Sequence, residues 1–168
     1  QAVQLFGMPQ AIFADIATLR DNGVVDDYFI IHLLKPSKAP DVRITLKASY
    51  LMCEREPRFT LHGTEGSFVK YGLDRQEEDL TNGLMPDSPH WGEEDSSIWG
   101  LLHTEKNTIN VRERYPSLPG NYGAFYENIY QHIRNGIILE SDAREVVDVI
   151  RLIEAAWESS RTKSVQNL

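Results

Sequence analysis

The chain has 168 residues, 41% of them hydrophobic and 10% aromatic, which is enough to build the core of one globular domain. Its formal charge of -8 argues against a nucleic acid partner, because a negative surface repels the phosphate backbone. No apolar run approaches the roughly 18 residues that a transmembrane helix needs, so we expect no membrane partner.

The N-terminus predicts the end of a helix. Residues 1–6 have the pattern of the last turns of an amphipathic helix, and Gly7 follows as a left-handed cap. A helix that is already in progress at Gln1 suggests that more of the protein precedes it.

A series of antiparallel strands follows this helix. Residues 11–19 and 27–35 are strand-like, and Asp21-Asn22-Gly23 between them is a turn signal, so we expect a hairpin. In residues 42–50 apolar side chains alternate with Arg43, Thr45, Lys47 and Ser49, as in a half-buried strand.

Two further short strands, 58–62 and 67–71, are joined by the turn Gly63-Thr64-Glu65-Gly66. The next expected elements are a short helix at 74–80, a loop at 81–97 and a strand at 108–114.

The last third predicts two amphipathic helices. The first carries its stripe on Tyr122, Phe125, Tyr126, Ile129 and Ile133 and ends at Gly136; the second carries Val146, Val149, Ile150, Ile153 and Trp157, with Ser141 as N-cap and Asp142 in its first turn. Strands first and helices afterwards indicate the α+β class rather than a βαβ alternation.

Little in the chain predicts chemistry of its own. The turn at 63–66 joins two strands, so it cannot present a helix N-terminus to a dinucleotide phosphate. No spacing of the histidines predicts a metal site; His32 and His62 are expected to be hydrogen-bonded sheet residues. The acidic runs 77–79 and 93–95 are expected to be solvated surface carboxylates rather than cation ligands.

A few side chains are open to a second interpretation. Tyr122, at the start of its helix, fits a core stripe but can also point its phenol at a polar ligand. Trp91 and Trp99 can stack on a sugar or cover a sheet edge. Cys53, the only cysteine, excludes an internal disulfide and favours a reducing, cytoplasmic compartment.

Four segments, spread over nearly the whole chain, share one family likeness: QAVQLFGMP (1–9), VDDYF (25–29), LHGTEGSFVKYGLDRQE (61–77) and YGAFY (122–126). Together they resemble the C-terminal domain of the glucose-fructose oxidoreductase and inositol dehydrogenase (Gfo/Idh/MocA) family, in particular its bacterial scyllo-inositol dehydrogenase-like branch.

The resemblance implies a large, open-faced, mostly antiparallel sheet with helices on one side. By the same resemblance, residues 1–168 form a single C-terminal substrate and oligomerisation domain. An N-terminal Rossmann domain that holds NAD or NADP would precede it and is absent from this chain. The other sheet face would be a subunit interface of a homo-oligomer. In this chain that face carries the polar residues Arg43, Thr45, Lys47 and Ser49, so the interface would be hydrated.

The family's catalytic motifs, Glu-Lys-Pro and Asp-x-x-x-His, do not occur in this chain. The resemblance places the catalytic histidine a few residues upstream of Gln1, so we expect no catalytic, cofactor-binding or metal residue here and no activity of this half alone. The substrate would be a sugar, a polyol or a related hydroxy compound.

The resemblance also assigns the substrate-binding residues of this half as Cys53, Arg55 and Tyr122. Relatives often carry tyrosines where this chain has Cys53 and Arg55, which favours a different, charged substrate. The alternative function is a free-standing ligand-binding or dimerisation module that performs no redox chemistry.

Overall fold

The computed structural model describes residues 1–106, 109–140 and 143–168, which fall into two compact units. The first unit combines Gln1–Cys53 with Ser141–Leu168, and the second is Glu54–Glu140. Within the described residues, no helix is long and apolar enough to cross a membrane.

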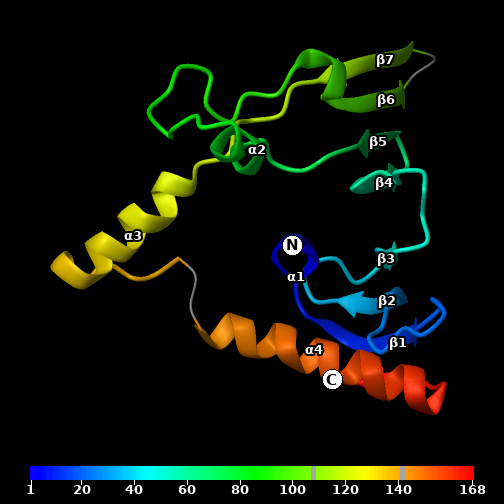
Figure 1. Ribbon diagram of the computed structural model, residues 1–168. Coiled ribbons are helices and arrows are strands. Elements are labelled where there is room, and N and C mark those ends of the chain that lie inside the picture. Colours follow the sequence, from blue (N-terminus) through cyan, green and yellow to red (C-terminus); the bar gives the residue numbers. More distant parts are fainter. Residues whose placement is uncertain (107–108, 141–142) are drawn as a thin grey trace. The chain divides into compact units, whose positions relative to one another are not determined.

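The first unit is a four-stranded sheet with two helices (Figure 1). Its elements are α1 (Ala2–Phe6), β1 (Pro9–Ala17), β2 (Tyr28–Pro36), β3 (Ile44–Ser49), α4 (Ala143–Thr162) and β8 (Gln166–Asn167). The strand order is β3-β2-β1-β8, and every neighbouring pair is antiparallel. The predicted hairpin at 11–35 and the strand within 42–50 are therefore confirmed.

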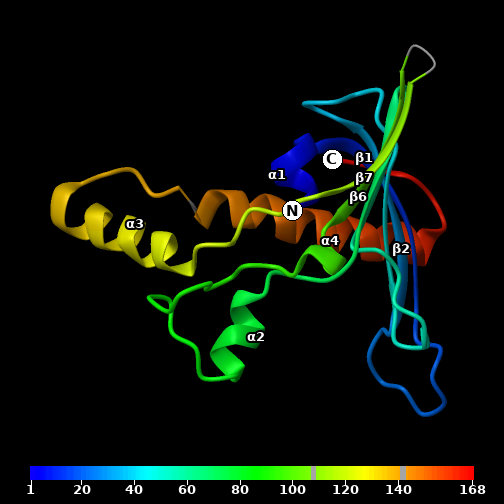
Figure 2. The same ribbon diagram turned by 90° about the horizontal axis from the view of Figure 1, so that it is seen from above.

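One face of this sheet forms the core of the first unit. The register aligns Ile12, Leu33 and Ile44 across three strands, so their side chains share a face. Ala14 of β1 and Leu152 and Ala156 of α4 complete the buried cluster. Both α1 and α4 lie on this side of the sheet (Figure 2). Thr45, Lys47 and Ser49 alternate with the core residues of β3 and therefore face away from the helices.

The outer edge of β1 is closed by the end of α4. The Ser159 hydroxyl accepts the Ala14 N–H at 2.9 Å, and the Ser160 hydroxyl accepts the Ile16 N–H at 2.9 Å. Further along, β8 pairs with Ala11 and Ile12. These contacts occupy backbone groups that would otherwise leave a strand edge open to other chains.

The second unit holds another antiparallel four-stranded sheet, in the order β4-β5-β6-β7. Its elements are β4 (Phe59–Gly63), β5 (Gly66–Lys70), α2 (Gln76–Thr81), the short 3-10 helix η1 (Ser96–Ile98), β6 (Gly100–Lys106), β7 (Ile109–Tyr115) and α3 (Tyr122–Asn135). Sequence analysis missed β6, the partner of β7, and also the two-residue β8. The alternation in β6 is interrupted by the adjacent pair Leu101-Leu102 and gives no clear period of two.

The helix ends agree with the sequence in one case and differ in another. Gly136 ends α3 in the left-handed conformation, with φ 67° and ψ 19°, as expected from its position after the apolar stripe. Gly7 ends α1 with a positive φ of 78°, but its ψ of 176° is extended, so the predicted left-handed cap is wrong there. The expected N-cap Ser141 and its neighbour Asp142 lie outside the described residues.

The fold class is α+β with antiparallel sheets, as predicted, and its strands are divided between two four-stranded sheets. The helix predictions at 74–80 and in the last third are confirmed by α2, α3 and α4.

Candidate functional site

The three predicted substrate-binding residues are all exposed in the described structure. Cys53 and Arg55 lie on the connection between β3 and β4. Cys53 ends the N-terminal segment of the first unit, and Arg55 belongs to the second unit. Tyr122 is the first residue of α3, and 40% of its surface is exposed. Arg55 and Tyr122 therefore belong to the same unit but to different elements.

A buried glutamine holds the start of α3. Gln76 is only 1% exposed, and its Oε1 accepts the Tyr122 backbone N–H at 2.8 Å and the Trp91 indole N–H at 3.0 Å. Its Nε2 and its own backbone N–H both donate to Asp74 Oδ1, at 3.1 and 2.8 Å. One side chain thus links α2, the loop after it and the first turn of α3.

This link also explains why two glycines stand nearby. A Cβ on Gly120 would collide with Asp74 Oδ2 and Gln76 Nε2, and one on Gly92 would lie 3.2 Å from Gln76 Cγ. Asn121 then caps α3, because its side chain accepts the Ala124 N–H at 3.0 Å. The Tyr122 backbone is therefore fixed by its own hydrogen bond to Gln76 and by the Asn121 cap that precedes it.

Two carboxylates of the acidic runs are buried, contrary to the expectation that these runs are solvated. Asp79 is 4% exposed and accepts the Gly92 N–H at 2.8 Å, with the Arg75 guanidinium 3.6 Å from its other oxygen. The Glu94 side chain is 7% exposed and pairs with Lys70 at 2.9 Å. Both carboxylates connect the loop after α2 to the rest of the unit. A run of acidic residues in the sequence does not show which of them is buried.

Both tryptophans of this loop donate to the protein itself. Trp91 donates to Gln76, as described above, and Trp99 Nε1 donates to the Glu94 carbonyl at 3.1 Å. Their indole N–H groups therefore hydrogen-bond within the second unit. This favours a structural role for both tryptophans over stacking on a sugar.

The histidine prediction is confirmed where hydrogen bonds are defined. His32 Nδ1 lies 3.1 Å from Thr45 Oγ1 on the neighbouring strand, and His62 Nδ1 lies 2.8 Å from Ser67 Oγ. In the described part of the chain, no group of three or more His, Cys, Asp or Glu side chains is arranged to hold a metal ion.

The glycine turn does not fit a dinucleotide. Gly63 and Gly66 face each other as the closing pair of the β4–β5 hairpin, as predicted. A nucleotide pyrophosphate is bound where a glycine-rich turn leads from a strand into a helix, so its backbone N–H groups point at the phosphates. This turn leads into another strand, so it does not fit a dinucleotide pyrophosphate.

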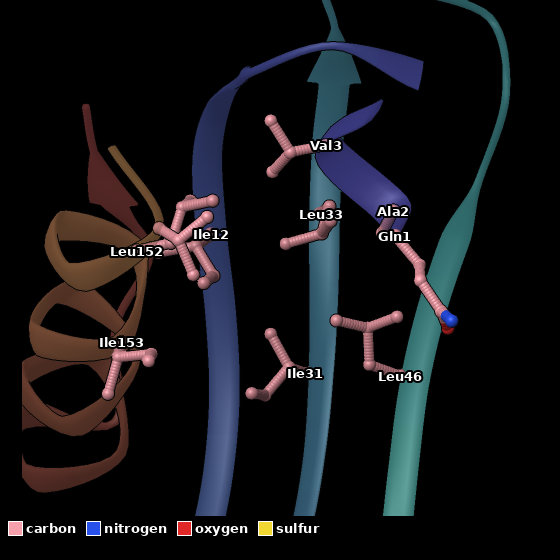
Figure 3. Close-up of a pocket in the computed structure, with 10 residues that line it drawn as sticks. Gln1, Ala2, Val3, Ile12, Ile31, Leu33, Leu46, Leu152 and Ile153 are labelled. Atoms are coloured by element: carbon pink, nitrogen blue, oxygen red, sulfur yellow. The ribbon is translucent and has the colours of Figure 1, made fainter. Parts of the chain in front are cut away.

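The first unit contains an apolar hollow of about 170 Å³ between α1, the core face of the sheet and α4 (Figure 3). Its walls are aliphatic side chains, with Gln1 as the polar exception. They comprise Ala2, Val3, Ile12, Ile31, Leu33, Leu46, Val149, Leu152 and Ile153. A sugar needs several converging polar groups, so this hollow is a packing feature and not a polyol site.

Comparison with known proteins assigns the whole chain. The model of the oxidoreductase family C-terminal alpha/beta domain matches residues 1–168. The chain belongs to the Gfo/Idh/MocA oxidoreductase family. The Gfo/Idh/MocA resemblance seen in the sequence is therefore confirmed.

Its relatives are oxidoreductases about twice as long. The chain is 36% identical over 163 residues to the scyllo-inositol 2-dehydrogenase (NADP(+)) IolW of Bacillus subtilis, a match covering 97% of the chain and 44% of that protein. It is 32% identical over 165 residues to the uncharacterized oxidoreductase YhhX of Escherichia coli, covering 98% and 46%. The crystal structure of a proposed oxidoreductase from Bacteroides fragilis superimposes with a TM-score of 0.92 at 59% identity, covering 99% of the chain and 49% of that protein.

Proposed function

We propose that this chain is the C-terminal half of an NAD(P)-dependent oxidoreductase that moves a hydride between nicotinamide and a sugar, polyol or related hydroxy compound. The observation that carries the proposal is the family match over residues 1–168, together with 36% identity to a scyllo-inositol 2-dehydrogenase. The chain spans about half the length of the relatives it matches, so the proposal concerns the whole protein.

In this proposal the two halves divide the work. The half that precedes Gln1 binds NAD or NADP and supplies the catalytic groups, as the resemblance implies. The present half contributes a wall of the substrate pocket. We expect it to be inactive alone, because its glycine turn at 63–66 joins two strands and cannot bind a dinucleotide pyrophosphate.

The pocket wall in this proposal consists of Cys53, Arg55 and Tyr122. The Tyr122 phenol can donate to or accept from a substrate hydroxyl, and the Arg55 guanidinium can bind a carboxylate. Arg55 therefore favours a substrate that carries an acidic group as well as hydroxyls, for example a sugar acid.

We further propose that the protein is a cytoplasmic homo-oligomer that associates through the sheet face opposite the helices. Thr45 and Lys47 are exposed on that face of β3. Polar side chains of this kind give a hydrated interface, with bridging water beside direct hydrogen bonds.

The test is enzymatic. The full-length protein is assayed with NAD and with NADP against inositols, aldoses and sugar acids, beside a protein consisting of residues 1–168. Cofactor reduction by the full-length protein alone supports the proposal and identifies the substrate. If the full-length protein folds and binds neither cofactor, the proposal is wrong and a ligand-binding or dimerisation module becomes the better account.

A further inference from the structure

The hydrogen bonds around Gln76 point to a role for this residue that goes beyond packing. Gln76 is almost completely buried, and both polar atoms of its side chain are hydrogen-bonded. Oε1 accepts from two N–H donors, and Nε2 donates to Asp74, as does the Gln76 backbone N–H. Since one of the two donors is the backbone N–H of Tyr122, the place of Tyr122 depends directly on the place of Gln76.

We infer that Gln76 is a positioning residue for substrate binding, which acts by holding Tyr122 at the pocket wall. The inference rests on the proposed function, in which Tyr122 contacts the substrate. A helix start has backbone N–H groups without partners inside the helix, and here a buried side chain supplies an acceptor for one of them. The acceptor thereby fixes where α3 begins.

The surroundings leave the helix start little freedom. Gly120 precedes the cap at a point where a Cβ would collide with Asp74 and Gln76, so the backbone passes directly against this pair. The Trp91 indole N–H shares the same Oε1 at 3.0 Å and keeps that oxygen oriented. A displacement of the glutamine amide would therefore shift residues 120–122 together.

Small displacements of this kind matter for reaction rates. Misplacing a substrate-orienting group by about 1 Å can cost on the order of a hundredfold in rate. We therefore expect Gln76→Met, which has a similar shape but neither the acceptor nor the donor, to lower kcat/KM for the hydroxy substrate by roughly tenfold to a hundredfold. The KM for the nicotinamide cofactor should not change.

The experiment is a double-mutant cycle in the full-length enzyme, with the panel substrate that it turns over fastest. The variants are Gln76→Met, Tyr122→Phe and the two combined, with kcat and KM measured separately for substrate and cofactor. Ser159→Ala is the control for lost stability, because Ser159 is also buried and hydrogen-bonded but lies in the other unit. It should reduce stability and leave both KM values unchanged.

The inference predicts that Gln76→Met and Tyr122→Phe each lower kcat/KM for the substrate, and that Gln76→Met has little further effect once the Tyr122 hydroxyl is gone. If Tyr122→Phe lowers kcat/KM but Gln76→Met does not, the positioning role is wrong while the proposed substrate contact stands. If Tyr122→Phe has no effect, the proposed contact and the role built on it both fail.

Gln76→Glu keeps the experiment decisive if Gln76→Met does not fold. This variant retains an acceptor oxygen for Tyr122 and Trp91 but places a second carboxylate against Asp74. A loss of kcat/KM that largely disappears in the Tyr122→Phe background supports the inference. Unchanged kcat/KM, or an equal loss in both backgrounds, overturns it.

Discussion

Lys70 and Glu94 form an ion pair with little access to solvent. Their side chains are 12% and 7% exposed, and Lys70 Nζ also donates to the carbonyls of Tyr71 and Ile98 at 2.9 Å each. Removing one partner from such a pair leaves the other charge buried without compensation.

We therefore expect Lys70→Met to lower the free energy of unfolding by about 3 kcal/mol in urea titrations. Arg161→Met is the matched control: its pair with Glu158 is exposed (72% and 46%), and its loss should cost at most about 1 kcal/mol. Equal losses in the two variants would contradict the role of the Lys70 pair.

Asp27 stabilises the loop between β1 and β2. The Leu19 N–H, donating to this carboxylate at 2.7 Å, is the main cause that lowers the pKa of Asp27, and the Arg20 side chain adds to the effect. A lowered pKa in the folded state means that the stabilisation is present above the unfolded value of about 3.9 and is lost as pH falls through the lower folded pKa.

Asp27→Asn should therefore reduce stability at neutral pH, and the difference from the unmodified protein should shrink as the pH is lowered below about 4. Urea unfolding at a series of pH values measures this, with Asp26→Asn as an exposed control for the lost charge. A difference that stays constant from pH 7 to pH 2 would show that ionisation of Asp27 contributes nothing.

At the scale of elements, hydrophobic periodicity in the sequence predicts helices and strands. It does not predict contacts made by single buried polar side chains. The stripe from Tyr122 to Ile133 predicts α3, and the alternation at 42–50 predicts β3. The network around Gln76 was not predicted, because a glutamine in a short acidic helix looks like a surface residue. Gly120 was the available signal: a glycine directly before a helix cap can indicate close backbone approach.

Gly120→Ala tests that close approach. The added Cβ would strike Asp74 and Gln76, so we expect a loss of about 1–3 kcal/mol in the free energy of unfolding. Gly63→Ala is the control, because its Cβ would meet only the Gly66 carbonyl at an ordinary 3.7 Å. A Gly120 variant as stable as the Gly63 variant would mean that residues 120–122 have room to move.

The edge of β1 offers a second test at this scale. Ser159→Ala removes the acceptor of the buried Ala14 N–H, and an unsatisfied buried donor costs about 1–3 kcal/mol. The exposed Ser96→Ala should change stability by less than about 0.5 kcal/mol. Hydrogen exchange of the Ala14 amide should speed up in Ser159→Ala, and unchanged exchange would contradict the assigned bond.

At the scale of the whole molecule, we propose that the chain is one half of a longer oxidoreductase. The family match covers 1–168, whereas the relatives extend to about twice that length. The resemblance to the family rests on four segments, of which 61–77, combining a hairpin turn with the start of α2, is the most specific. It could not identify the substrate, because residues of the pocket wall define a reaction only together with the groups that face them.

We propose that this half forms a wall of the substrate pocket and that the preceding half binds the cofactor. The most direct measurement is the binding of NADH and NADPH, by calorimetry, to the full-length protein and to residues 1–168, followed by turnover of the substrate panel. We expect cofactor binding and turnover by the full-length protein and neither by residues 1–168. Nicotinamide binding by residues 1–168 alone would contradict this proposal.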